Sequence, residues 1–211
     1  MSAEGPVREW FEDAEKQAYA SSVGMWLFLG SELLLFGGLF ALYCAYRVLY
    51  PTEFFEASHH NEVVIGTTNT YLLISSSFTA AWAVHSLRAG ARRMAVASVA
   101  ATLVMASAFL VLKGIKYSHH IRDGIMPGSL YTFAELPGPG AKLFFTLYYF
   151  MTGLHGLHVI GGMIALATVG YAVHKGTVAP AYPIALDNAA LYWHLVDAIW
   201  IFLWPLLYLV G

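Results

Sequence analysis

Five histidine and acidic side chains lie well away from the ends of long apolar stretches of the chain, where a charge is costly and each group needs a partner or a proton. They are Glu32, His155, His158, His194 and Asp197. Two pairs are three residues apart, at positions 155 and 158 and at positions 194 and 197, so in a helix each pair lies on one face. Side chains of these types exchange protons, bind metals or haem, or hold helices together through hydrogen bonds.

Packing with some proton exchange is favoured over metal or haem binding, because each pair can be satisfied by hydrogen bonds across helices. Glu32 lies near the middle of its apolar stretch, where a proton-accepting carboxyl and a hydrogen-bonded structural carboxyl fit equally well. No metal site is predicted. No residue is assigned a catalytic role, because the chain carries no nucleotide-binding loop, zinc motif or nucleophile with a matched base.

Composition excludes several other kinds of chemistry. The net charge is −2 and there is no basic tract, so no nucleic-acid partner is predicted. Cys44 is the one cysteine, which rules out a disulfide within the chain. Without a Cys-x-x-Cys-His motif, no haem is attached covalently.

Helices that cross a membrane must position the five ionisable residues. Hydrophobic residues make up 58% of the 211 and charged residues 11%, whereas a soluble domain carries roughly 25% charged residues. A helix needs about 20 apolar residues to cross the hydrocarbon. Five stretches are long enough, at residues 23–49, 63–87, 94–116, 143–173 and 184–210. The predicted fold class is all-α, a polytopic membrane protein with a bundle of five transmembrane helices.

The five predicted spans place the ionisable residues at similar depths, because successive helices alternate in direction. Glu32 on the first span, the pair on the fourth and the pair on the fifth are therefore predicted to form one buried polar cluster. Residues 1–22 mix charged and aromatic side chains and are predicted to form an N-terminal arm, not a signal peptide. Residues 23–211 form the five-helix domain, with residues 50–62 and 117–142 as loops.

Glycines on the first and fourth spans are predicted to permit close contact between helices. They are Gly30, Gly37, Gly38, Gly153, Gly156, Gly161 and Gly162.

A compact basic loop follows the second span. Arg88, Arg92 and Arg93 predict that this loop, and with it the N-terminus, lies in the cytoplasm. The same arginines, with Trp82 and His85 just before them, are candidates for binding phospholipid head groups. A plain topology signal explains the arginines equally well.

Three longer motifs surround the ionisable residues. They are Leu-Gly-Ser-Glu-Leu-Leu-Leu-Phe at 29–36, Thr-Gly-Leu-His-Gly-Leu-His-Val at 152–159 and Tyr-Trp-His-Leu-Val-Asp-Ala-Ile-Trp at 192–200, with weaker support at 69–77 and 85–87. In this order and on these helices, the chain resembles subunit III of the haem–copper terminal oxidases, in its short five-helix bacterial form. The resemblance covers about residues 23–211.

The resemblance implies a non-catalytic subunit of a proton-pumping oxygen reductase in the bacterial plasma (inner) membrane. Haem and copper lie in the partner subunits I and II, and none is bound by this chain. The family's helices form a V-shaped cleft that holds phospholipids. Glu32 matches its buried carbodiimide-reactive carboxyl. The family subunit sustains proton uptake and protects the catalytic subunit from inactivation during turnover.

Other functions stay open at this point. An accessory protein of nitric oxide reductase systems shares the motifs, and an independent transporter or haem-binding membrane protein is a more distant alternative. A quinol oxidase has the same subunit, but Glu32 favours a cytochrome c oxidase because quinol-oxidase versions often carry Asp there. The chain departs from the family at Lys116-Tyr117, where Glu-Tyr is common, which reverses a charge near the membrane surface. It also lacks the first two helices of the longer form, so the lipid cleft has different walls.

Overall fold

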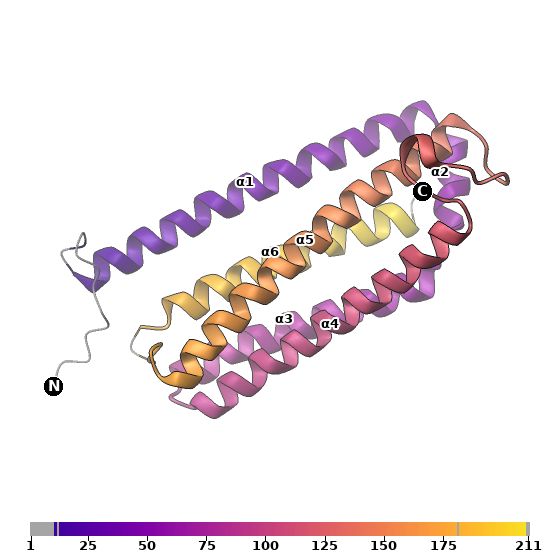
Figure 1. The fold of residues 1–211 in the computed structure, drawn as a ribbon. Coiled ribbons are helices and arrows are strands. Elements are labelled where there is room, and N and C mark those ends of the chain that lie inside the picture. Colours follow the sequence, from indigo (N-terminus) through magenta and orange to yellow (C-terminus); the bar gives the residue numbers. More distant parts are fainter. Residues whose placement is uncertain (1–10, 12, 181, 210–211) are drawn as a thin grey trace.

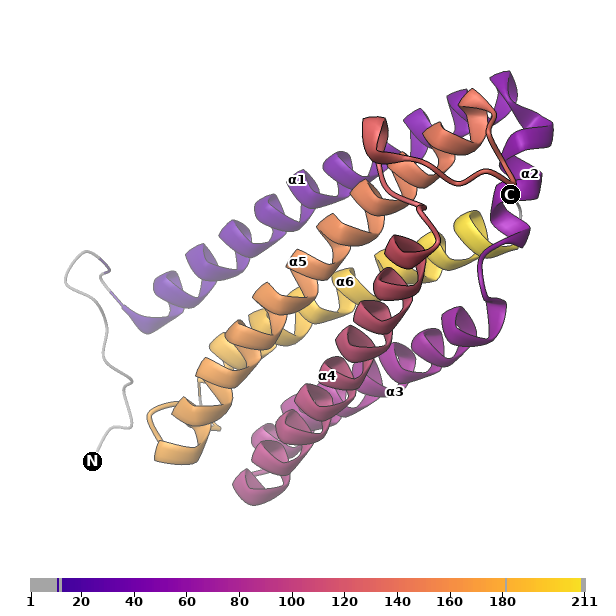
Figure 2. The same cartoon turned by 45° about the vertical axis from the view of Figure 1, so that its right-hand side comes forward.

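A computed structural model describes residues 11, 13–180 and 182–209, which contain helices and no strand. The helices are α1 (Ala14–Leu49), α2 (Pro51–His59), α3 (Val63–Arg88), α4 (Arg92–Arg122), the 3-10 helix η1 (Gly128–Leu130), α5 (Pro139–Lys175) and α6 (Ile184–Tyr208). The five long helices run lengthwise beside one another, with α2 at the end where α1 finishes (Figure 1). Both views place α5 and α6 between α1 and the pair α3–α4 (Figure 2).

Four of the described helices are long and apolar enough to cross a membrane, namely α1, α4, α5 and α6. Helix α3, the second predicted span, has 26 residues but is less apolar, because serine, threonine and asparagine interrupt it. The described residues are therefore all-helical, as predicted, and their four candidate spans are consistent with a polytopic membrane protein. By length and apolar composition, four of the five predicted spans are supported.

Helix α1 begins earlier than the predicted first span. The Asp13 carboxylate caps it by accepting a hydrogen bond from the backbone N–H of Lys16 at 2.7 Å. The helix has 36 residues, about 54 Å at ~1.5 Å per residue, which exceeds the hydrocarbon thickness of about 30 Å. Its first turns therefore contain the end of the predicted arm. Residues 1–10 and 12 of that arm lie outside the described residues, so the division at residue 22 stays a prediction.

Helix α2 replaces part of the predicted loop at 50–62. Pro51 stands in its first turn, where the missing N–H costs no hydrogen bond. Phe54 is fully buried and packs edge-on against Tyr43 of α1 and Phe144 of α5, with ring centroids 5.3 and 5.5 Å apart. A nine-residue helix is too short to produce a periodic apolar pattern, which is why the sequence does not predict it.

Helix α6 is the central element of the core. Its two fully buried tryptophans both bind α3: Trp193 Nε1 donates to Ser76 Oγ and Trp200 Nε1 donates to Thr70 Oγ1, each at 3.1 Å. From α1, the Tyr43 hydroxyl donates to the Leu206 carbonyl at 2.7 Å. Ser76 and Thr70 of α3 are thus hydrogen-bonded inside the bundle, facing α6.

The predicted glycine contacts hold for only part of the set. A Cβ added at Gly162 would lie 2.8 Å from Cε3 of Trp193, so α5 approaches α6 closely there. At Gly30, Gly37 and Gly156 an added Cβ would meet nothing within 4 Å. The prediction of close contact within this chain is therefore wrong for the α1 glycines, which have open space around them.

Candidate functional site

Glu32 of α1 and His158 of α5 form the closest ionisable pair predicted from the sequence. Glu32 Oε2 lies 2.7 Å from His158 Nε2, and both side chains are 14% exposed. His158 Nδ1 lies 2.8 Å from the Leu154 carbonyl, which can only accept, so Nδ1 carries a hydrogen. Nε2 then either accepts a proton from the neutral carboxyl or donates one to the carboxylate.

One proton therefore serves both groups of this pair. It can reside on Glu32 Oε2 or on His158 Nε2 without any movement of the heavy atoms. In either state the pair as a whole is neutral, which avoids the large desolvation cost of a single buried charge. Phe36 covers the imidazole edge-on at 5.2 Å, and the Tyr192 hydroxyl donates to the His158 carbonyl at 3.2 Å. The arrangement can hold or exchange a single proton in a mostly apolar setting.

His155 points to different helices from His158, although the two are only three residues apart. It is fully buried, and its Nε2 donates to the Val196 carbonyl of α6 at 3.1 Å. The rings of Phe109 and Trp200 lie 5.6 and 5.1 Å away. His155 therefore joins α5 to α6 and to the aromatic side of α4.

His194 and Asp197, the pair on α6, also have different surroundings. His194 Nδ1 lies 2.6 Å from Ser77 Oγ of α3. Asp197 is 3% exposed, and within the described residues neither carboxyl oxygen has a hydrogen-bond partner. No group of three or more His, Cys, Asp or Glu residues in the described part of the chain is placed to hold a metal ion. The single predicted cluster is thus three local arrangements, at Glu32–His158, His155–Val196 and His194–Ser77.

Replacing His194 with alanine is expected to weaken the contact between α3 and α6. One hydrogen bond is lost, so the free energy of unfolding should fall by about 1 kcal/mol. A double-mutant cycle with Ser77→Ala in detergent-solubilised protein measures this coupling, and the exposed Ser75→Ala is the matched control. Additive losses from the two substitutions would show that this hydrogen bond contributes nothing to packing.

The predicted head-group residues have different surroundings. Arg88 pairs with Asp187 of α6 at 2.9 Å. Arg92 donates to the carbonyls of Val173 and His174 and so caps the C-terminal end of α5. Arg93 is exposed.

The aromatic members of that predicted set lie on the outer face of α3. Trp82 and His85 have ring centroids 5.2 Å apart, and Trp82 is 45% exposed.

A groove runs between α1, α3 and α6, which we call the α1–α6 groove. Its outer part, about 400 Å³, is lined by residues that include Trp26, Arg88 and His194. Its inner part, also about 400 Å³, is bordered by Leu29 and Gly30 and shares Trp26 and His194 with the outer part. The groove is polar at the Arg88 end and apolar towards Gly30. A phospholipid has the same arrangement, with a polar head group at one end and apolar acyl chains at the other.

The sequence profile described as cytochrome c oxidase subunit III matches residues 16–211. The chain belongs to the subunit III family. Among its relatives, cytochrome c oxidase subunit 3 of Corynebacterium diphtheriae is 32% identical over 192 residues, covering 90% of this chain and 87% of the relative. Quinol oxidase subunit 3 of Bacillus spizizenii is 30% identical over 194 residues, covering 90% and 86%. A probable cytochrome c oxidase subunit 3 of Mycobacterium leprae is 33% identical over 194 residues, covering 90% and 87%.

Membership in the subunit III family confirms the prediction made from the three motifs. It also confirms the coarse function, an accessory subunit of a haem–copper oxidase, and association with such a complex. Cytochrome c oxidase and quinol oxidase subunits match at similar identity, so the relatives do not select the electron donor.

Two lysines of α4 are buried in the bundle, and they were not predicted as a pair from the sequence. Lys113 and Lys116 of α4 are 6% and 1% exposed. Lys113 Nζ donates to the Tyr148 hydroxyl at 3.1 Å, and Lys116 Nζ lies 4.5 Å from the centroid of the Tyr208 ring. The side chain of Lys116 is enclosed by the bundle, and its predicted depth near the membrane surface stays a prediction. The three-residue spacing, which puts both lysines on one helix face, is the signal that could have revealed them.

Proposed function

We propose that the chain is a non-catalytic subunit of a proton-pumping oxygen reductase of an aerobic respiratory chain. It would pack against catalytic subunit I and subunit II, which hold the haem and copper. The observation that carries the proposal is the Glu32–His158 hydrogen bond, because two of the three family motifs meet there and share one proton. The proposed role is to sustain proton uptake and to protect the catalytic subunit during turnover.

We propose that α3 is the fifth transmembrane span. It has 26 residues, about 39 Å in length, which is enough to cross the hydrocarbon. Its exposed side chains form an apolar stripe three or four residues apart, at Tyr71, Ile74, Phe78 and Trp82. Several of its hydroxyl groups bond to carbonyls of the same helix, as where Thr67 donates to the Val63 carbonyl at 2.8 Å. Such a helix can face lipid despite its polar composition.

The proposed location is the bacterial inner membrane, with the N-terminus in the cytoplasm. The start of α1, the end of α3 and the start of α6 lie at the same end of the bundle (Figure 1). Asn188 donates to Ser21 Oγ at 2.9 Å there, and Arg88 pairs with Asp187. The Arg88, Arg92 and Arg93 loop favours the cytoplasmic side for this end.

We propose that the α1–α6 groove holds a phospholipid. Arg88 at its outer end offers a cation to the phosphate, while Leu29, Leu33 and Leu195 line the inner end. The groove contains Gly30, one half-turn of α1 before Glu32. An acyl chain in it would keep water from the Glu32–His158 pair on that side.

Replacing Glu32 with glutamine tests the proton-exchange role of the pair. The amide can still hydrogen-bond to His158 but cannot release a proton, so assembly and haem content should be unchanged. The initial rate of oxygen reduction should change by less than about twofold, because Glu32 is not a catalytic residue, while the number of turnovers before inactivation should fall. Glu56→Gln, on the exposed side of α2, is the control. Complete loss of oxygen reduction in a correctly assembled Glu32→Gln oxidase would contradict the proposal.

Comparing the oxidase with and without this chain tests the proposed function as a whole. The depleted complex should keep its haem and copper spectra and its initial oxygen reduction. It should lose activity after fewer turnovers and take up protons more slowly. A depleted complex with intact haem that reduces no oxygen would assign catalysis to this chain. Spectra and donor specificity of the same preparation distinguish a cytochrome c oxidase, which Glu32 favours, from a quinol oxidase or a nitric oxide reductase system.

A further inference from the structure

A second cavity lies at the corner where α1 ends and α2 begins, far along α1 from the α1–α6 groove. We call it the α1–α2 pocket. It measures about 640 Å³ and is lined by Cys44, Arg47, Val48, Pro51, Thr52 and Phe55. Most of the lining is apolar, and Arg47 is its one charged side chain.

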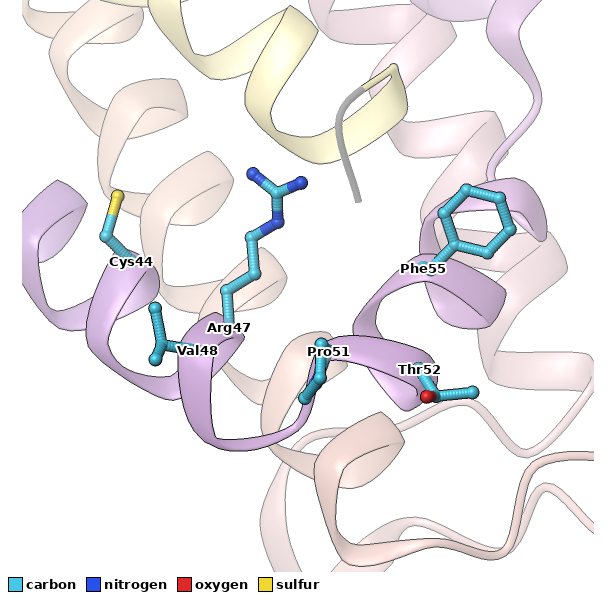
Figure 3. A pocket seen from close by; sticks show the side chains of 6 residues that line it. All are labelled: Cys44, Arg47, Val48, Pro51, Thr52 and Phe55. Atoms are coloured by element: carbon cyan, nitrogen blue, oxygen red, sulfur yellow. The ribbon is translucent and has the colours of Figure 1, made fainter.

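Arg47 is a cation without a counter-ion in the described part of the chain. It is partly buried in the last turn of α1, and no hydrogen bond or ion pair joins its guanidinium to another described residue. Figure 3 shows the side chain extended away from α1, with Cys44 on one side and Phe55 on the other. A guanidinium presents a planar set of donors that matches a phosphate or carboxylate, so the pocket is ready for an anion.

The surroundings of the pocket select the kind of anion. Its apolar wall is open to the surroundings of the bundle, because the lining side chains Val48 and Phe55 are 80% and 56% exposed. An acidic side chain of a neighbouring protein would satisfy Arg47 alone. A phospholipid satisfies both parts, with its phosphate on the guanidinium and an acyl chain along the apolar face.

We propose that the α1–α2 pocket binds an anionic phospholipid through Arg47. This site belongs to the leaflet opposite to that of Arg88, because the two arginines lie at opposite ends of the bundle. The inference rests on the chain crossing the membrane and does not depend on the identity of the parent complex. Failure of this site would leave the proposed oxidase function intact.

Cys44 provides a built-in probe of the pocket. It is exposed, it is the one cysteine of the chain, and it lines the pocket one helical turn before Arg47. The full-length chain would be placed in lipid nanodiscs of phosphatidylcholine alone or with one part in five of phosphatidylglycerol. The rate of Cys44 labelling by an uncharged maleimide is then compared between the two compositions.

Phosphatidylglycerol should slow the labelling of the unaltered chain about fivefold, the factor expected for one basic residue at an anionic surface. Arg47→Gln should remove most of this slowing and Arg47→Lys should keep part of it. Arg93→Gln, which removes an exposed arginine at the other end of the bundle, should leave it unchanged. Native mass spectrometry should find one more retained phosphatidylglycerol on the unaltered chain and on Arg93→Gln than on Arg47→Gln.

Three results would overturn the proposal. Equal slowing in the unaltered chain and in Arg47→Gln would show only a general effect of membrane charge on the thiol. Slowing by inorganic phosphate in phosphatidylcholine discs, to the same extent as by phosphatidylglycerol, would indicate a site for small anions. In the intact oxidase, protection of Cys44 that is the same in both lipid mixtures would show that another subunit fills the pocket.

Discussion

Gly162→Leu is expected to force α5 away from α6 and to lower the free energy of unfolding by about 3 kcal/mol, the upper part of the range for overpacking a core. An added Cβ at this position would lie 2.8 Å from the Trp193 ring, before the rest of the leucine is counted. Trp193 cannot retreat, because it is fully buried and its Nε1 donates to Ser76 of α3. The thermal midpoint and the yield of assembled protein in mild detergent measure the effect.

Gly156→Leu is the matched control for this substitution. It lies on the same helix, and an added Cβ there would meet nothing within 4 Å. Both substitutions raise helix propensity by the same amount, so the difference between them isolates the contact with Trp193. The control should change the free energy of unfolding by less than about 0.5 kcal/mol. Equal losses in the two variants would mean that α5 and α6 do not meet closely at Gly162.

Glu53→Gln is expected to have the second-largest effect, about 2 kcal/mol, because it removes a charged acceptor at the start of α5. The Glu53 carboxylate on α2 accepts hydrogen bonds from the backbone N–H groups of Gly140 and Ala141. These first-turn groups have no partner within their own helix, and the helix dipole favours a negative charge beside them. The amide of glutamine keeps one weaker acceptor and loses the charge.

Hydrogen exchange localises the effect of Glu53→Gln. Amides in the first turns of α5 should exchange faster, while those near its centre should be little changed. Glu56→Gln, one turn later on α2 and exposed, should leave exchange in α5 unaltered. If the two variants behaved alike, the contact between Glu53 and α5 would not stabilise this end of the bundle.

The long helices could be predicted from the sequence because an apolar stretch of about 20 residues has few alternatives to a membrane span. The nine-residue α2 could not, although it supplies Phe54 to the core and Glu53 to the first turn of α5. Helix α3 is intermediate, because the sequence predicts the helix but its composition only partly supports a membrane span. Its hydroxyl groups lower its hydropathy, yet several of them bond to their own helix or to α6.

The sequence predicted which residues belong to the candidate site, but not which of them contact one another. Depth in the membrane follows from residue number, and it placed Glu32 level with His158. Direction around the helix does not follow from depth. Residues three apart are turned by about 60°, which sends His158 towards α1 and His155 towards α6. Whether residues of two helices contact each other depends on how the helices pack. The residue spacing within one helix does not determine that packing.

The most direct test of the central claim, that this chain is a non-catalytic subunit of a haem–copper oxidase, is a mild-detergent pull-down of the tagged chain. The bound proteins are identified and an optical spectrum is recorded on the same sample. We expect a haem–copper catalytic subunit to co-purify, to show its haem spectrum and to reduce oxygen. Recovery of the chain alone, colourless or with a haem of its own, would contradict it.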